Sequence, residues 1–413
     1  MATIRPFPAL RPIPEKAADV AALPYDVYNR EEAVKVAYGD YDTFLRVDRP
    51  EITMDPRIDI HDPAVYRQAV RNLNRLIDRD IMIQDDMPCL YLYELVMEGR
   101  SQIGLVCCVS IDEYMDNTIK KHEKTRSDKE VDRTQHVDAL NANTGPIFLT
   151  YRHLKEIDTV INRLKSDPPE VDFTSEDDIT HRVWVIEKEK DIAALVSAFE
   201  KVPELYIADG HHRSASAVHV GQMRREEHPD YTGEEEFNYF LAVAFPDNQL
   251  QILDYNRVVK DLNGLSPETF LDKVKENFDV RKIARGIYRP KDKAEFGMYL
   301  DGYWYQLKAK EGSYPAEDPL ESLDVAILQN NLLQPILGIE DPRTDCRIDF
   351  VGGIRGLEEL ERRVSEDMRV AFAMYPTEIS ELMAIADADA LMPPKSTWFE
   401  PKLRSGLFIH YLE

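Results

Sequence analysis

Hydrophobic positions along the chain alternate between a helical period and a strand-like period, which predicts a mixed fold. Apolar residues within Ala64–Asp80 recur at positions 65, 66, 69, 70, 73, 76 and 77, which form one stripe of a helix starting after Asp62-Pro63. The apolar runs Cys89–Met97 and Gln102–Ile111 flank the turn-forming sequence Glu98-Gly99-Arg100-Ser101. They predict two strands joined as a β-hairpin.

Similar patterns continue to the end of the chain and predict an α+β fold with mixed sheets and hairpins. The runs Phe237–Phe245 and Leu250–Val259 predict a second hairpin around Pro246-Asp247-Asn248. The other predicted strands are 146–151, 181–186, 204–208, 296–300, 303–308, 347–351, 369–374 and 407–412, and the other helices are 157–165, 191–202, 214–227, 266–277, 323–336, 357–366 and 377–387. The pattern restarts near residue 262, so we expect domains at 1–260 and 261–413.

Charge narrows the classes of partner. The 413 residues include 51 Lys plus Arg and 76 Asp plus Glu, a net charge of −25. This excess of acid argues against a nucleic-acid binder and against attraction to anionic membranes. The net charge still allows small anionic ligands to bind where the cations are concentrated in one place.

Nothing in the sequence predicts export or a membrane span. The longest apolar runs, such as Gly104–Val109 and Tyr239–Phe245, are far shorter than the roughly 20 residues of a membrane helix. The start of the chain has prolines at positions 6, 8 and 12 and lacks the apolar core of a signal peptide. The four cysteines, at 89, 107, 108 and 346, show no CxxC or zinc spacing, so we expect reduced thiols in a cytoplasmic protein.

The most informative segment is a polar turn between a predicted strand ending at Ala208 and a helix expected from Ser214. It reads Asp209-Gly210-His211-His212-Arg213. The free N–H groups at the start of a helix bind anions, and glycine lets the backbone approach a ligand closely. Arginine binds phosphate through two parallel hydrogen bonds, and histidine can add further donors. The pattern predicts a phosphate site at Gly210, His211, His212 and Arg213.

Two other interpretations of this turn remain open. Asp209 can be a simple helix N-cap, with the histidines and the arginine facing solvent. Asp209, His211 and His212 can instead hold a metal ion, although adjacent histidines on one helical turn point in different directions.

A second candidate is the basic stretch 120–133, which contains six Lys or Arg and four acids. Lys121 and Lys124 are expected to contact phosphate. Glu123 is a candidate base or magnesium ligand, and the neighbouring cations keep it ionised, which suits magnesium better than base catalysis. The stretch does not form the HExxH motif of zinc proteases, because Arg126 stands where the second histidine is required. A solvated polar loop is the alternative.

Candidate substrate contacts are spread over the rest of the chain. Arg5 and Arg11 are candidates for binding a substrate carboxylate, and Tyr25 and Asp26 are further contacts, unless this segment is only an N-terminal arm. His136 and Asn143 can return to the same cleft, or act as ordinary helix or cap residues. Lys395 and Lys402 belong to a polar loop, 392–405, that can close over a ligand or remain an ordinary surface loop.

The segment Ala208–Arg213 resembles the signature of a bacterial and archaeal family known as domain of unknown function 1015. Four further blocks extend the resemblance over nearly the whole chain, and on them the chain is identified as a member. These blocks are Pro24-Tyr25-Asp26-Val27, His122-Glu123-Lys124-Thr125, Gly145-Pro146-Ile147-Phe148 and Met392-Pro393-Pro394-Lys395-Ser396-Thr397.

The Asp-Gly-His-His-Arg block is also similar to the phosphate-binding motif of free-serine kinases in the ParB/sulfiredoxin-like superfamily. This second resemblance covers little beyond the block. It implies a ParB/sulfiredoxin-like core elaborated by additional α/β segments, with nucleotide phosphates held by the four residues 210–213. It also implies phosphoryl transfer to free serine, although relatives in that superfamily bind nucleotides without being kinases.

Together these observations predict a nucleotide-dependent kinase that converts free L-serine to O-phosphoserine, with ATP or ADP and Mg²⁺ as cofactors. Asp209 and Glu123 are expected to hold magnesium or accept the proton of the hydroxyl group. The site is expected in domain 1–260, with the 392–405 loop of the second domain closing it. The alternatives are a non-catalytic nucleotide sensor or adaptor and a metal-dependent hydrolase, and a homodimer is left open.

Overall fold

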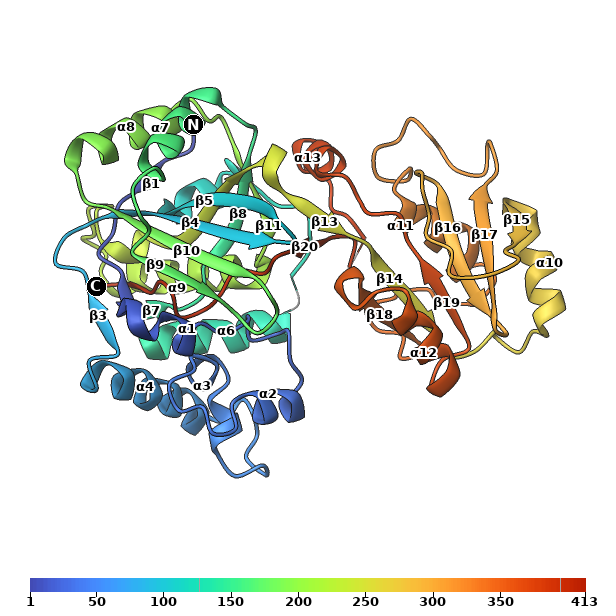
Figure 1. Ribbon diagram of the computed structural model, residues 1–413, viewed down its shortest axis with the longest axis horizontal. Helices are drawn as coiled ribbons and strands as arrows, with labels where there is room; N and C mark the ends of the chain where they lie inside the picture. The colour runs from blue at the N-terminus through green and yellow to red at the C-terminus, as the bar shows by residue number, and fades with distance from the viewer. Residues whose placement is uncertain (126, 394) are drawn as a thin grey trace. The chain divides into compact units, whose positions relative to one another are not determined.

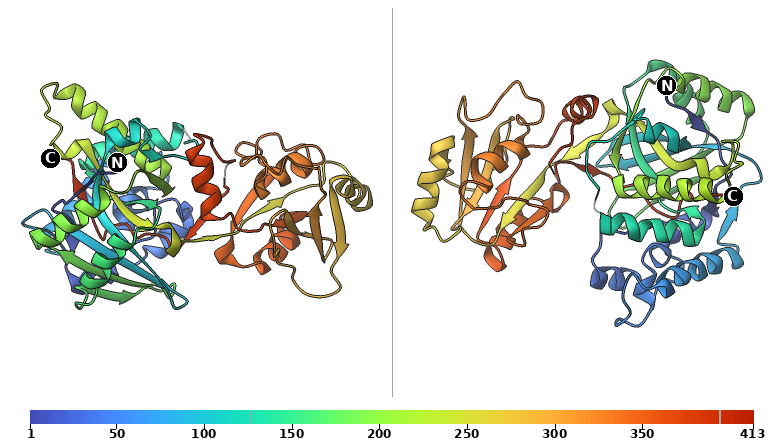
Figure 2. Two further views of the ribbon diagram at one scale, coloured as in Figure 1. Left: turned by 90° about the horizontal axis from the view of Figure 1, so that it is seen from above. Right: turned by 180° about the vertical axis from the view of Figure 1, so that it is seen from behind.

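The computed structural model describes residues 1–125, 127–393 and 395–413, and the chain forms two compact units (Figure 1). Arg126 of the basic stretch and Pro394 of the 392–405 loop lie outside the described residues. The first unit contains Met1–Lys121, Thr125–Leu250 and Pro401–Glu413, and the second contains His122–Lys124 and Gln251–Glu400. Figure 2 shows each unit from two further directions.

A mixed nine-stranded sheet forms the centre of the first unit. Its strands are β1 (Ile4–Arg5), β4 (Leu90–Met97), β5 (Arg100–Ser110), β6 (Ile119–Lys120), β8 (Ile147–Tyr151), β9 (Val171–Thr174), β10 (Thr180–Ile186), β11 (Leu205–Asp209) and β12 (Tyr239–Pro246). The order is β6-β11-β8-β12-β5-β4-β10-β9, with β1 paired to β5. The α+β class with mixed sheets is therefore confirmed.

The first predicted hairpin is confirmed, but the second is wrong. β4 and β5 pair antiparallel from Tyr91↔Val106 to Met97↔Arg100. In contrast, β12 lies between β5, to which it is antiparallel, and β8, to which it is parallel. Its residues 240–245 are completely buried, so the strand requires neighbours on both edges and cover on both faces. The strands that follow it, β13 (Gln251–Leu253) and β14 (Tyr255–Val259), belong to the second unit.

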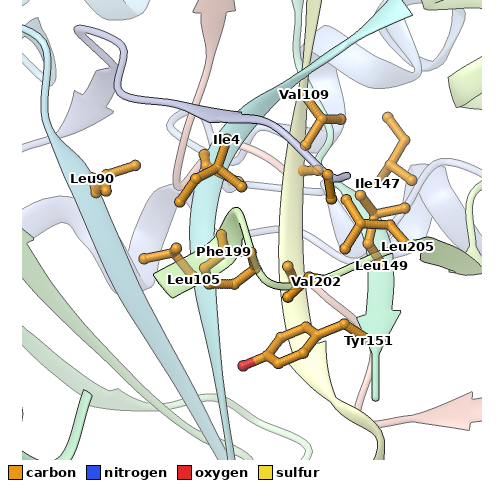
Figure 3. Packing of buried hydrophobic residues seen from close by; sticks show 14 of the residues in the cluster. Ile4, Leu90, Leu105, Val109, Ile147, Leu149, Tyr151, Phe199, Val202 and Leu205 are labelled. Carbon is orange, nitrogen blue, oxygen red and sulfur yellow. The ribbon is translucent and has the colours of Figure 1, made fainter. Parts of the chain in front are cut away.

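The helices α1 (Ala17–Val20), α2 (Arg30–Val36), α3 (Leu45–Asp48), α4 (Pro63–Asp78) and α6 (Ser127–Leu140) contribute to a separate apolar core. The apolar partners of the sheet come from α5 (Ile111–Met115), α7 (Lys155–Leu164), α8 (Glu189–Phe199) and α9 (His211–Glu227). The predicted helix at 64–80 is confirmed as α4. Part of the core lies around Leu105, Ile147, Leu149 and Phe199, which come from two strands and one helix (Figure 3).

The last residues of the chain complete the first unit. β21 (His410–Tyr411) pairs with β7 (Ala142–Asn143), and Phe408, Ile409 and Leu412 are buried. Sequence analysis placed a division near residue 260 and assigned all of 261–413 to a second domain. In the structure the chain enters the second unit at 250/251, because β14 pairs with strands of that unit, and returns at 400/401.

The second unit is built on an antiparallel six-stranded sheet of order β15-β17-β16-β19-β14-β18. The predicted helix at 323–336 is a short α-helix, α11, followed by a π-helical segment at Gln329–Leu333. The elements are β15 (Phe278–Lys282), β16 (Glu295–Leu300), β17 (Tyr303–Ala309), β18 (Ile348–Gly352), β19 (Val370–Ala373), β20 (Trp398–Glu400), α10 (Pro267–Asn277), α11 (Asp324–Leu328), α12 (Glu358–Glu366) and α13 (Ile379–Asp387). β20 pairs with β13.

The described residues bear on the predictions about membrane spans and cysteines. No helix in this part of the chain combines the length and the hydropathy needed to cross a membrane. Cys89, Cys107 and Cys108 are buried free thiols and Cys346 is an exposed one, as expected for reduced cysteines.

Candidate functional site

The polar turn joins β11 to α9, and the helix begins earlier than its sequence predicts. α9 starts at His211 instead of Ser214, with Gly210 as its N-cap residue. The backbone N–H of Ser214 donates to the carbonyl of Gly210 at 2.9 Å, which closes the first helical turn. His211, His212 and Arg213 therefore form the positive end of a 17-residue helix dipole.

Both the backbone conformation at position 210 and the close approach of Arg213 favour glycine there. Its φ of 98° lies in the left-handed region, which favours glycine. A Cβ at this position would lie 3.1 Å from Nη2 of Arg213, so the guanidinium packs directly against the turn.

Arg213 is held by several parts of the first unit at once. Its Nη1 donates to the carbonyl of Pro146 at 2.7 Å, and its Nη2 lies 3.5 Å from Oδ2 of Asp209. A Cβ on Gly145 would lie 3.3 Å from the same Nη1. The guanidinium is thus fixed in place, with part of its donor capacity already used by the protein.

Asp209 lies between two cations. Nζ of Lys402 and Nη2 of Arg213 each lie 3.5 Å from its Oδ2. Burial raises the pKa of this carboxyl, but the nearby charges of Lys402, Arg213 and His211 lower it by more. The resulting pKa is about 2, below the ordinary value of an aspartate. Asp209 is therefore a persistent anion, which suits a magnesium ligand and makes it a weak proton acceptor.

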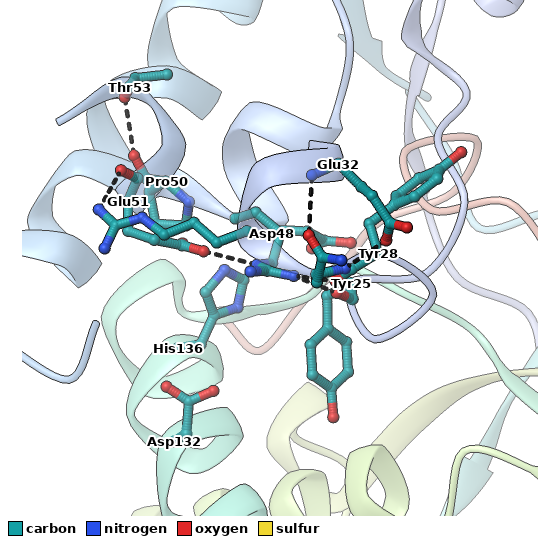
Figure 4. Close-up of polar contacts among 12 residues, drawn as sticks. Tyr25, Tyr28, Glu32, Asp48, Pro50, Glu51, Thr53, Asp132 and His136 are labelled. Carbon is teal, nitrogen blue, oxygen red and sulfur yellow. Dashed lines mark hydrogen bonds and ion pairs between the residues drawn. The ribbon is translucent and has the colours of Figure 1, made fainter. Parts of the chain in front are cut away.

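A small cavity of about 30 Å³ lies beside Arg213. It brings together two residues that sequence analysis proposed for a shared cleft, His136 and Asn143. The other lining residues are Pro24, Tyr25, Asp48, Arg133, Val137, Thr144, Gly145, Ile147, Arg213, Ala217 and Ser405. Figure 4 shows Tyr25, Asp48 and His136, which come from three separate segments of the chain.

The charged groups around this cavity are paired. Arg133 forms an ion pair with Asp132 at 2.8 Å, and its guanidinium stacks 4.2 Å from the centre of the Tyr25 ring. Asp48 accepts a hydrogen bond from the hydroxyl of Thr144 at 3.0 Å. Burial raises the pKa of Tyr25, so its hydroxyl remains protonated.

His136 is a neutral histidine in this cavity. Its Nε2 lies 3.0 Å from the backbone carbonyl of Val47. Burial lowers the pKa of His136 to about 4, and the charge of Arg133 lowers it as well. The ring is therefore uncharged at neutral pH.

The remaining predicted phosphate contacts have structural partners of their own. Lys121 follows β6, which runs parallel to β11, and its Nζ donates to the carbonyl of Tyr114 at 2.6 Å. Glu123 and Lys124 belong to the segment His122–Lys124 of the second unit. Lys395 also lies in the second unit, with Nζ 5.6 Å from the centre of the Tyr255 ring. The joint metal role of Asp209 and Glu123 remains a prediction.

Arg5 and Arg11, proposed for a substrate carboxylate, bind carboxylates of the protein itself. Arg5 pairs with Glu234 at 3.3 Å and with Glu236 at 3.2 Å. Arg11 pairs with Asp85 at 2.8 Å and Glu170 at 2.9 Å. Their role toward a substrate remains a prediction in which the substrate must compete with these partners.

Sequence reasoning assigned no role here to Asp48, Arg133 or Thr144, and it did not connect Lys402 with Asp209. The prediction for the 392–405 loop gave the only signal for Lys402. Asp48 carries no such signal, because it is a single acid at the end of the short helix α3.

The chain belongs to the family described as "Protein of unknown function (DUF1015)", whose sequence profile matches residues 4–326. No curated protein matches the chain in sequence. Among solved structures, it is similar to C-terminally truncated SbnI from Staphylococcus aureus, at 12% identity and a TM-score of 0.40, over 74% of this chain and 87% of that one. It is also similar to a free serine kinase in complex with AMP, at 12% identity and a TM-score of 0.36, over 73% and 91%. A third is a conserved hypothetical protein from Pyrococcus furiosus, at 13% identity and a TM-score of 0.35, over 74% and 95%.

Proposed function

We propose that the turn 209–213 binds the phosphate groups of a nucleotide, ATP or ADP, and that the protein transfers a phosphoryl group to the hydroxyl of a small acceptor, free L-serine. The observation that carries this proposal is the start of α9 at Gly210, next to the cations Arg213 and Lys402. A helix N-terminus with fixed cations binds phosphate oxygens through backbone N–H groups and side-chain donors together. The resemblance of the Asp-Gly-His-His-Arg block to the phosphate motif of free-serine kinases supports the same assignment.

Phosphoryl transfer needs charge neutralisation and positioning more than covalent chemistry. Arg213 is pre-positioned by Pro146 and Asp209, so little of its conformational freedom is lost on binding. Asp209 fits a magnesium ion, which typically takes one or two carboxylates and completes its shell with phosphate and water oxygens. Magnesium would neutralise the charge of the phosphates there, with Glu123 as the predicted second carboxylate.

The mechanism also needs a base that takes the proton of the acceptor hydroxyl. The serine oxygen would form a bond to the transferred phosphorus as the bond to the nucleotide oxygen breaks, and the hydroxyl proton must pass to a base. Since the pKa of Asp209 is about 2, this carboxylate is better suited to metal binding than to proton transfer. Glu123 is the other carboxylate that the sequence offers for this proton, although its neighbouring cations suit magnesium binding better than base catalysis.

A non-catalytic nucleotide sensor is the second candidate, and one observation favours it. Both cations of the turn lie 3.5 Å from Asp209, an arrangement that holds a phosphate site together without adding a strong base. Such a protein would bind nucleotide without turnover.

Calorimetric titration with ATP and with ADP, each with Mg²⁺, tests the proposal together with detection of phosphoserine by ³¹P NMR. Arg213→Ala is expected to weaken nucleotide binding at least tenfold, about the loss of one charge-assisted hydrogen bond. Arg225→Ala, in the last turn of the same helix, is the matched control and should bind as the wild type does. Absence of binding by both nucleotides would overturn the proposal, and binding without phosphoserine would select the sensor.

A further inference from the structure

We propose that the cavity beside Arg213 binds the hydroxyl group of the small acceptor, with Asn143 donating a hydrogen bond to its oxygen and Asp48 or His136 accepting a hydrogen bond from it. This inference rests on the proposed function, because it names where the acceptor of the same site would be held. It is argued from the hydrogen-bonding polarity of three buried side chains on the cavity wall.

Asn143 contributes a donor. Its Oδ1 accepts a hydrogen bond from the backbone N–H of Leu241 at 3.1 Å. Because a backbone N–H can only donate, the end of the amide facing Leu241 must be the oxygen, and the orientation of the side chain is fixed. Asn143 is 3% exposed, and its Nδ2 has no hydrogen-bond partner within residues 1–125, 127–393 and 395–413. A buried donor of this kind costs stability unless something binds it.

His136 contributes an acceptor. Its Nε2 faces the carbonyl of Val47, which can only accept, so Nε2 carries the proton. Since the ring is neutral, Nδ1 has a lone pair and no proton. The tautomer is thus set by the backbone of α3.

Asp48 contributes a second acceptor. Its residue is 4% exposed, and its Oδ1 already receives the Thr144 hydroxyl. A carboxylate oxygen accepts hydrogen bonds, so Oδ2 is a further acceptor.

One donor, Asn143, and two acceptors, His136 and Asp48, determine which chemical group can bind in the cavity. A carboxylate or phosphate has only acceptors and cannot donate to Asp48 or His136, and an ammonium has only donors and cannot accept from Asn143. A hydroxyl group does both, and its hydrogen rotates to suit the site. The volume of about 30 Å³ is enough for a hydroxyl group or one or two water molecules, whereas a whole nucleotide is far too large. Arg213 lines the cavity and also packs against Gly210, so a hydroxyl held there would lie next to the phosphate turn.

Two isosteric substitutions test this polarity in the full chain. Asn143→Asp keeps the oxygen that accepts from Leu241 and replaces the Nδ2 donor by an acceptor. Asp48→Asn keeps an oxygen for Thr144 and replaces Oδ2 by a donor. The double variant exchanges the donor and the acceptor and restores a pair that a rotatable hydroxyl can satisfy.

Binding of L-serine is measured by calorimetry, with L-alanine as the matched compound that lacks only the hydroxyl. We expect L-alanine to bind the wild type at least tenfold more weakly than L-serine, and each single variant to weaken L-serine about tenfold. The double variant should recover most of this loss, and L-alanine affinity should change little in any variant. Thermal unfolding of each variant shows whether it is folded.

The outcomes separate this inference from the proposed function. Equal binding of L-serine and L-alanine, no binding of L-serine, or a double variant no better than the singles would overturn the inference and assign the cavity to ordered water only. If ADP binds but any of these overturning results is found for L-serine, the nucleotide site stands and the acceptor site fails. If ADP fails to bind but L-serine binding depends on Asn143 and Asp48 as described, the proposed phosphoryl transfer fails and the hydroxyl site stands.

Discussion

The ammonium of Lys402 lies 3.5 Å from the carboxylate of Asp209, although the segment Gln251–Glu400 of the second unit separates the two residues in sequence. With Arg213, also at 3.5 Å, Lys402 keeps Asp209 ionised at the start of α9. The charge balance of the turn is therefore set partly by the last segment of the chain.

Asp209 should give the protein a measurable dependence of stability on pH. Its folded pKa of about 2 lies below the ordinary value of an aspartate, about 3.8, so its contribution is complete above pH 4 and is lost as pH falls toward 2. Allowing for its partial exposure, we expect Asp209→Asn to cost about 1 kcal/mol at pH 6 and close to nothing at pH 2. Urea unfolding at pH 6, 4 and 2.5 measures this difference. Lys402→Met should cost less in the Asp209→Asn background than alone, and equal costs would contradict the pairing.

Gly210→Ala should lower both stability and nucleotide affinity. The substitution places a Cβ at a φ of 98° and 3.1 Å from Arg213. We expect a loss of about 2 kcal/mol in the free energy of unfolding, of which roughly half is backbone strain. Gly233→Ala is the control, since Gly233 has a φ of 96° and open space around its Cα, so it should show the strain alone. Equal losses for the two variants in urea unfolding would mean that Arg213 adjusts freely.

His136 should make the first unit less stable in mild acid. Its folded pKa of about 4 lies below the ordinary value of a histidine, about 6.5, so the unfolded chain binds the proton more tightly than the folded chain does between these two pH values. Stability is therefore complete above about pH 6.5 and falls as pH decreases toward 4, by about 2–3 kcal/mol from this group. His136→Gln keeps a donor for the Val47 carbonyl and should flatten the pH profile of the unfolding free energy. An unfolding profile as steep in His136→Gln as in the wild type would contradict this assignment.

Phe408→Ala should destabilise the first unit strongly. Phe408 is completely buried and packs against Tyr91 and Tyr93, with ring centres 5.3 and 5.8 Å away. Removal of a buried aromatic ring from a core costs about 3–5 kcal/mol. Ile354→Ala, at a side chain that is half exposed, should change the unfolding free energy by less than about 0.5 kcal/mol. A Phe408→Ala protein with an unchanged thermal transition would show that the C-terminal segment is not part of the first core.

Elements defined by local patterns could be predicted from the sequence. The stripe of α4 and the turn between β4 and β5 are examples, because residues close in sequence determine both. The error at β12 has the opposite cause. Its apolar run predicts a strand, but its partners β5 and β8 are distant in sequence, and only the packing of the whole sheet selects them.

The candidate site shows the same division. The segment 209–213 could be recognised because five informative residues are consecutive. The contact of Lys402 with Asp209 and the meeting of Asp48 with Thr144 join separate segments, and no spacing in the sequence encodes them. The start of α9 was placed three residues late, because the unusual φ of Gly210 allows the helix to begin directly after it.

The pairing of β21 with β7 has a consequence for synthesis of the protein. His410 is the strand partner of Asn143, so the strand that carries Asn143 lacks its partner until His410 and Tyr411 leave the ribosome. The second unit emerges complete before that moment, and the first unit must wait with an open edge and an uncovered part of its core. A ribosome that stops anywhere in the second unit releases a chain without Lys402 and without β21. The candidate site is therefore assembled only in chains that have been translated past His410.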